Sequence, residues 1–190
     1  MSRHILVIQG HPDPAPGHLC RALADAYADG AREAGHSVER FDIATLDFPL
    51  LRSQDAFEHE PVPEVLRPAQ AAILNAEHVV LVFPLWHGTM PALVKGFLEQ
   101  VIRPGMNPAA KSAAHPLAGR SARVVVTMGM PALLYRWWYG AHGLRGLERS
   151  ILGFVGMRPV RHTLFGLAGA GERTRRSWLA RMRALGAKAA

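Results

Sequence analysis

The chain has 190 residues, of which 49% are hydrophobic and 19% are charged, so it can bury a full core and is not mainly disordered. Its single cysteine, Cys20, excludes a disulfide framework and a cysteine-based zinc site, and a reducing, cytoplasmic setting is expected. The net charge of +7 is unevenly placed: residues 1–95 carry 7 basic and 12 acidic side chains, and residues 96–190 carry 15 basic and 3 acidic. This asymmetry indicates either an anionic ligand or a solvated basic face.

The sequence predicts neither a signal peptide nor a membrane span. The apolar run near the start of the chain is too short for a signal peptide, and no stretch approaches the roughly 20 apolar residues of a membrane helix. The length suits one domain over residues 1–190.

The first half of the chain alternates strand and helix patterns. In chain order it predicts a strand at Ile5–Ile8, a helix from Leu19 that ends at Gly35, a strand at Val38–Ile43, an irregular segment from Ala44 to Pro63 and a helix from Glu64 to Ala76. The strands are short apolar runs, and the first helix repeats apolar residues at helical spacing. Pro68 is expected to kink the second helix or to reset its start.

The second half continues this alternation. It predicts a strand at His78–Phe83, a helix from Leu93 to Ile102, a loop from Gly105 to Gly119, a strand at Ala122–Met128, a helix from Leu144 to Val155, a strand at Arg158–Phe165 and a helix from Glu172 to Ala187. Five strands alternating with helices predict an α/β fold with a doubly wound, open five-stranded parallel sheet and helices on both faces. Ligands bind at the carboxyl ends of such strands, so the loops after the first, third and fourth strands are the candidate site.

The first of these loops, from Gly10 to His18, leads from a strand into a helix. Free backbone N–H groups and the positive end of the helix dipole favour a phosphate there, and His11 and His18 could add donors. The loop matches neither GxxxxGK[ST] nor GxGxxG, and a proline-rich structural turn is the alternative reading.

The other two loops carry aromatic residues. The second, from Phe83 to Pro91, contains an indole, an imidazole and a glycine, which suit a planar ligand, unless Trp86 only caps the core. The third, Thr127–Pro131, precedes the aromatic stretch from Tyr135 to Gly143, which suggests a flat ligand, a subunit interface, or both. A lone histidine such as His142 is more often structural than catalytic.

Together the loops resemble a known family. Gly10-His11-Pro12, then Phe83-Pro84-Leu85-Trp86 with Pro91-Ala92-Leu93-Val94-Lys95-Gly96-Phe97, and finally Tyr139-Gly140-Ala141-His142-Gly143 look like the flavodoxin-like NAD(P)H:quinone oxidoreductases, over roughly residues 4 to 165. The resemblance implies one flavodoxin-like domain in which NAD(P)H reduces a bound flavin by hydride transfer and leaves before a quinone enters. It also implies a homodimer whose subunits both line each site, and the pair Trp137-Trp138 fits an interface.

The resemblance also implies roles for single residues. The flavin phosphate would be held by His11, Gly17, His18 and Leu19. The isoalloxazine ring would lie along Pro84, Leu85, Trp86, His87 and Gly88, with Thr127 and Gly129 over its other side. His142, with Tyr139 or Tyr135, would stabilise the anionic reduced flavin and assist proton movement.

Some positions depart from the family pattern. Pro16 replaces a phosphate-binding serine, Arg136 stands where the family's tyrosine usually lies, and Met128 and Met130 interrupt a glycine-rich loop. FMN is favoured over FAD because the chain is short. A flavin-binding ancillary protein of a membrane transporter, with little turnover, is the alternative function. No metal is expected because no HExxH or paired-carboxylate pattern occurs, and no nucleic-acid motif is present.

Overall fold

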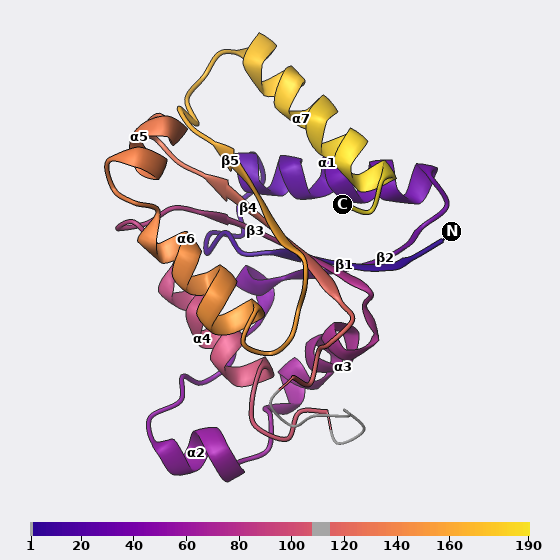
Figure 1. Cartoon of the computed structure of the whole chain (residues 1–190), viewed down its shortest axis with the longest axis vertical. Coiled ribbons are helices and arrows are strands. Elements are labelled where there is room, and N and C mark those ends of the chain that lie inside the picture. The colour runs from indigo at the N-terminus through magenta and orange to yellow at the C-terminus, as the bar shows by residue number, and fades with distance from the viewer. Residues whose placement is uncertain (1, 108–114) are drawn as a thin grey trace.

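The computed structural model describes residues 2–107 and 115–190, which are arranged around one parallel sheet (Figure 1). The sheet has the strand order β2-β1-β3-β4-β5, and all neighbouring strands are parallel. The strands are β1 (His4–Gln9), β2 (Ser37–Asp42), β3 (His78–Pro84), β4 (Ser121–Thr127) and β5 (Val160–Phe165). The predicted doubly wound sheet is confirmed, and each strand lies within two residues of its predicted bounds.

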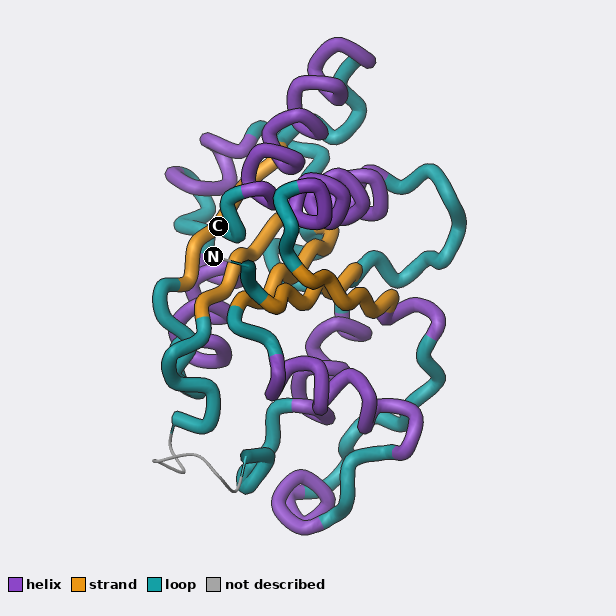
Figure 2. The backbone as a smooth tube through the Cα atoms, turned by 90° about the vertical axis from the view of Figure 1, so that its right-hand side faces the viewer, coloured by secondary structure: helices purple, strands orange, loops and turns teal. Residues whose placement is uncertain are grey.

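Helices cover both faces of the sheet, as predicted. In the described part of the chain the α-helices are α1 (Leu19–Glu33), α2 (Gln54–His59), α3 (Arg67–Asn75), α4 (Ala92–Val101), α5 (Ala132–Trp137), α6 (His142–Gly146) and α7 (Glu172–Ala187). Helices α1 and α7 lie on one face, and α3, α4 and α6 lie on the other (Figures 1 and 2). Across the described ranges, no helix has the length and apolarity that a membrane crossing requires.

The central strands β1, β3 and β4 are largely apolar because both of their faces are buried, whereas the outer strands β2 and β5 also carry charged side chains. Alternate residues enter two separate cores: Leu6 and Ile8 of β1 face α3 and α4, whereas Ile5 and Val7 face α1 and α7. The same alternation divides β3, whose seven residues are all buried. This sandwiching holds the carboxyl ends of β1, β3 and β4 at one rigid edge.

Helices α1 and α7 approach closely at two glycines. A Cβ atom on Gly30 would lie 2.1 Å from the backbone oxygen of Arg183, and one on Gly186 would lie 2.0 Å from that of Tyr27. No side chain fits between the helices at these positions, so the contact depends on glycine at both.

Several segments differ from the sequence prediction. The predicted irregular segment 44–63 contains α2, with Ser53 as its N-cap. The predicted helix 64–76 is a 3₁₀ turn (Glu64–Leu66) followed by α3, because Pro68 resets the start in the first turn. The predicted helix 144–155 begins earlier, as α6, and becomes a π-helical turn at Leu147–Leu152. The predicted loop 105–119 lies partly outside the described residues.

Candidate functional site

The site is built at the carboxyl edge of the sheet, where the strand order reverses between β1 and β3. The first loop leaves β1 at Gly10, whose N–H donates to the carbonyl of Val82 at 2.7 Å. A Cβ atom on Gly10 would lie 2.8 Å from Val94 of α4, so the loop passes directly over β3 and the start of α4. The first and second loops therefore lie side by side.

Two histidines of the first loop are stacked, and one of them meets the second loop. The rings of His11 and His18 lie 3.7 Å apart and nearly parallel, and the edge of Trp86 faces His11 at 6.3 Å between ring centroids. Asp13 orients this pair, because its carboxylate lies 2.8 Å from His18 Nε2 and accepts the N–H of Ala15 at 2.9 Å. The structure thus brings His11, His18 and Trp86 together.

The protonation of these groups follows from their surroundings. The Ala15 N–H, and then the hydrogen bond to His18, hold the pKa of Asp13 below its usual value. Partial burial, and then the neighbouring His18, lower the pKa of His11. At neutral pH His11 is therefore uncharged. The N–H of Asp13 lies 3.1 Å from its Nδ1, which favours the tautomer that carries its proton on Nε2.

The start of α1 offers backbone donors to an anion. Within the described ranges, the N–H groups of Gly17, His18 and Leu19 have no backbone acceptor, and the first turn contains no acidic residue. Below them, the Oε1 of the fully buried Gln9 accepts the His11 N–H, while its Nε2 lacks a described partner. These donors and the helix dipole fit the phosphate of a flavin nucleotide.

The second loop forms a tight turn that presents Trp86. The N–H groups of Trp86 and Thr89 each donate to the carbonyl of the other, and His87 and Gly88 between them have φ angles of 47° and 79°. Two positive φ angles are typical of a type I′ turn. The N–H of Leu85 is also used, donating to the Thr127 carbonyl at 2.7 Å. Of the backbone donors predicted for the ring of a flavin, those of His87 and Gly88 are left open.

Thr127 and Gly129 have different environments at the end of β4. Thr127 is buried, and its hydroxyl lies 3.1 Å from the Cys20 sulfur, beneath α1. Its side chain therefore faces the core instead of the surface expected for a flavin contact, because its position on β4 points toward α1. Gly129 is exposed, with open space around its Cα.

The third segment packs directly on the second loop. Tyr135, only 1% exposed, donates its hydroxyl proton to the Gly88 carbonyl at 3.1 Å and accepts the N–H of Leu144 at 3.3 Å. A Cβ atom on Gly143 would lie 2.4 Å from the same Gly88 oxygen. Burial and these two bonds let Tyr135 position the second loop, and its catalytic role stays a prediction.

His142 is placed differently from Tyr135. It is the first residue of α6 and is exposed, with its ring folded over the Cα of Gly140. Ala141, before it, adopts a left-handed conformation (φ 49°) that turns the chain from α5 into α6. Tyr139 is 53% exposed, so it is the tyrosine of this segment that is open to a ligand.

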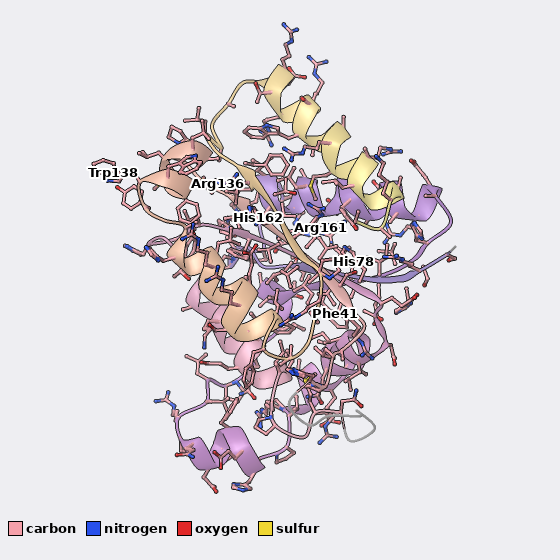
Figure 3. The ribbon with its side chains drawn as sticks, in the orientation of Figure 1. Phe41, His78, Arg136, Trp138, Arg161 and His162 are labelled. Atoms are coloured by element: carbon pink, nitrogen blue, oxygen red, sulfur yellow. The ribbon has the colours of Figure 1, made fainter. Side chains whose placement is uncertain are left out.

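Helix α5 and the residues after it form an exposed apolar surface, which we call the α5 patch. The guanidinium of Arg136 lies 5.8 Å from the ring of Trp137, and Figure 3 shows Trp138 pointing away from the body of the molecule. Trp137 and Trp138 are 77% and 81% exposed. The patch comprises Leu133, Leu134, Trp137, Trp138 and Tyr139.

Two features of the site have no clear signal in the sequence. The loop after β5 supports the third loop, because the N–H groups of Leu167 and Ala168 donate to the carbonyls of Met130 and Met128. Gln9 is the last residue of the largely apolar strand β1, and only this position at the strand end could have indicated its role.

The sequence and the fold are similar to those of known proteins. The sequence matches the family described as having a flavodoxin-like fold over residues 3–185. An FMN-dependent NADH:quinone oxidoreductase of Kineococcus radiotolerans is 31% identical over 142 residues, which cover 66% of this chain and 65% of the relative. A glutathione-regulated potassium-efflux system ancillary protein, KefG, of Shigella dysenteriae is 36% identical over 87 residues, 45% of this chain and 46% of the relative.

The chain thus spans about half to two thirds of the length of these curated relatives. Among solved structures, an NAD(P)H:quinone oxidoreductase from Methanothermobacter marburgensis is similar over 99% of this chain and 97% of that protein, with a TM-score of 0.81 and 23% identity. This likeness shows a shared fold, in agreement with the strand order. The match over residues 3–185 is decisive, and the chain belongs to the family of proteins with the flavodoxin-like fold.

Proposed function

We propose that the protein is an FMN-dependent NAD(P)H:quinone oxidoreductase and that residues 1–190 form its single domain. The observation that carries this proposal is the convergence of three loops at the switch point of the sheet. There the open N–H groups of α1, the half-exposed indole of Trp86 and the exposed His142 border one surface. The FMN-dependent relative supports FMN as the cofactor.

In this proposal the first loop binds the phosphate and the second bounds the ring. The N–H groups of Gly17, His18 and Leu19 and the Nε2–H of His11 would bind the phosphate. The turn at His87 and Gly88 would align the ring, which Tyr135 keeps in place through the Gly88 carbonyl. When bound, FMN supplies the capacity to accept a hydride and pass it on.

His142 has the proton-handling role. Its exposed imidazole would donate a hydrogen bond toward the edge of the ring where negative charge develops, and Arg136 adds positive charge to the same segment. Because one surface serves both NAD(P)H and the quinone, the first product must leave before the acceptor binds. The reaction is therefore of the ping-pong type.

A spectrum and a steady-state assay test this function. The purified protein, reconstituted with FMN, should be yellow, should bleach anaerobically with NADPH or NADH, and should recover its colour on addition of a quinone. Initial rates against both substrates should give parallel double-reciprocal lines. A protein that remains colourless with FMN refutes the proposal, and intersecting lines refute the ping-pong order.

A second candidate function has a specific observation in its favour. The relative KefG is an ancillary protein of a potassium-efflux system, and the exposed α5 patch offers a surface for a protein partner. A yellow protein with negligible turnover on quinones would favour this ancillary function over the enzyme.

A further inference from the structure

A polar cavity lies at the opposite, amino edge of the sheet. It has a volume of ≈ 380 Å³ and is formed where β3 and β4 begin, next to the segment that enters β5 and the residues after α7. The six strand positions of β1 separate it from the carboxyl edge by about 20 Å, given the rise of roughly 3.3 Å per residue. Its polar lining includes Arg3, Glu77, His78, Ser121, Arg158 and Arg161.

The charges around this cavity are mainly positive. Three arginines line it, and none of them takes part in an ion pair between described residues. The one acidic side chain of the lining, Glu77, accepts the N–H of His4 at 2.9 Å, and the terminal carboxyl group of Ala190 also borders the cavity. Behind the lining, the buried Arg123 adds a fourth guanidinium, which donates to the Thr163 hydroxyl and to the Ala190 carbonyl. The cationic groups therefore outnumber the carboxylates.

A buried histidine also lines the cavity and lacks a full set of partners. His78 is only 2% exposed; its Nδ1 lies 2.7 Å from the Ser121 hydroxyl, and its Nε2 has no described hydrogen-bond partner. Figure 3 shows His78 on β3 and Arg161 on β5 at this part of the sheet. An unpaired polar atom at such a buried position is costly unless a ligand or water meets it.

Burial and the same positive surroundings lower the pKa of His78. Burial, followed by the charges of Arg123, Arg3 and Arg161, lowers it to about 4. The ring is thus neutral at pH 7, and it carries its proton on Nε2 when Nδ1 accepts the Ser121 hydroxyl proton. A neutral donor among unpaired guanidinium groups is an environment that suits an anion.

We propose that the amino-edge cavity binds a phosphate-type oxyanion, independently of the flavin site. Arg3, Arg158 and Arg161 would supply charged N–H donors from three sides, and His78 Nε2–H would supply a neutral one. Several separated guanidinium groups match the distributed oxygens of a phosphate better than the two oxygens of a single carboxylate. The polar lining excludes an apolar ligand.

Calorimetric titration of the holoprotein tests this site. The protein is first saturated with FMN, so that the first turn of α1 is filled, and is then titrated in a phosphate-free buffer. Inorganic phosphate, pyrophosphate and glycerol phosphate serve as separate titrants, and the tightest of them distinguishes a free anion from a phosphate ester. Binding of at least one titrant with one-to-one stoichiometry is expected.

Two variants and a matched control locate the binding. Because Arg158 and Arg161 are exposed, Arg158→Ala and Arg161→Ala should fold normally, and each should weaken binding by roughly tenfold through loss of a charge-assisted hydrogen bond. Arg173→Ala removes an exposed arginine of α7 that does not line the cavity, and it should leave the affinity within about twofold. Circular dichroism confirms the fold of each variant.

Three outcomes would overturn the proposal. The first is that the wild type binds none of the titrants. The second is that all three variants weaken binding equally, which would indicate a nonspecific effect of charge. The third is that, among these variants and the additional first-loop variants His11→Ala and His18→Ala, only the two first-loop variants weaken binding, which would mean that phosphate had entered the first loop. Failure of FMN to bind would refute the proposed function alone, because the amino-edge variants still decide the second site.

Discussion

His142 and Tyr135 lie on the same short segment but in opposite environments. The exposed ring of His142 can reach a ligand, whereas the Tyr135 hydroxyl is occupied by the second loop. The family resemblance made both residues candidates for the same role, and their burial separates them in the structure. Each residue therefore calls for a different test.

Replacing His142 with alanine should slow the reduction of bound FMN by NAD(P)H by about tenfold to a thousandfold, because one donor to the developing negative charge is lost. The affinity for FMN should change little, since the exposed ring lies over Gly140 at the surface. Stopped-flow absorbance of the reductive half-reaction measures this rate. Tyr139→Phe is the control of similar exposure and should give a smaller effect; an unchanged rate in His142→Ala would assign the histidine a structural role.

Replacing Tyr135 with phenylalanine should lower the free energy of unfolding by about 1–3 kcal/mol, because the Gly88 carbonyl and the Leu144 N–H both lose a buried partner. Urea denaturation measures this loss, and Tyr139→Phe should leave stability within about 0.5 kcal/mol. FMN affinity should also fall as the second loop loosens. A stable Tyr135→Phe protein with slow hydride transfer would instead support the predicted catalytic role of Tyr135.

The thiol of Cys20 should be unreactive in the folded protein. Burial raises its pKa to about 11, so almost none of it is thiolate at pH 8. Ellman's reagent should release no colour from the native protein and one equivalent in urea. Rapid reaction without urea would show that the start of α1 opens in solution.

At the scale of elements, the contact between α1 and α7 depends on two glycines. Gly30→Ala should destabilise the protein by about 1–3 kcal/mol or more, since its methyl group would overlap the α7 backbone, and a gain of about 1 kcal/mol in helix propensity offsets this only in part. Gly146→Ala is the matched control, because it is helical with open space around it, and it should stabilise slightly. Equal stabilities of the two variants in urea would contradict this contact.

The central strands were predictable from the sequence because both of their faces are buried, so an apolar run such as 78–83 indicates a buried strand. Helix α5 was missed because its exposed face carries tryptophans and leucines, a pattern that suggests a loop with a binding role. The first and second loops were correctly expected to meet, because parallel strands end at one edge. The orientation of Thr127 toward Cys20 could not be predicted, since it depends on which face of β4 lies under α1.

At the scale of the molecule, the α5 patch should be covered by a second copy of the chain. The variant Trp137→Ala/Trp138→Ala should convert a dimer into a monomer, because the two side chains are the largest apolar groups that the patch exposes. Light scattering after size exclusion at micromolar concentration measures the mass. Phe154→Ala, which removes an exposed ring elsewhere, is the control. A monomeric wild type would refute the dimer. Dissociation caused by Phe154→Ala alone would show that the interface lies around Phe154 and not at the α5 patch.

The outer strands of the sheet restrict how two copies can meet. Strands β2 and β5 leave one row of backbone groups unpaired, and both carry charged or ionisable side chains: Glu39 and Arg40 on β2, and the exposed Arg161 and His162 on β5. Such side chains disfavour the docking of a foreign strand, so they guard against edge-to-edge aggregation. Two copies are therefore kept from extending the sheet into a continuous ribbon, and any closed pair would have to form through helices and loops.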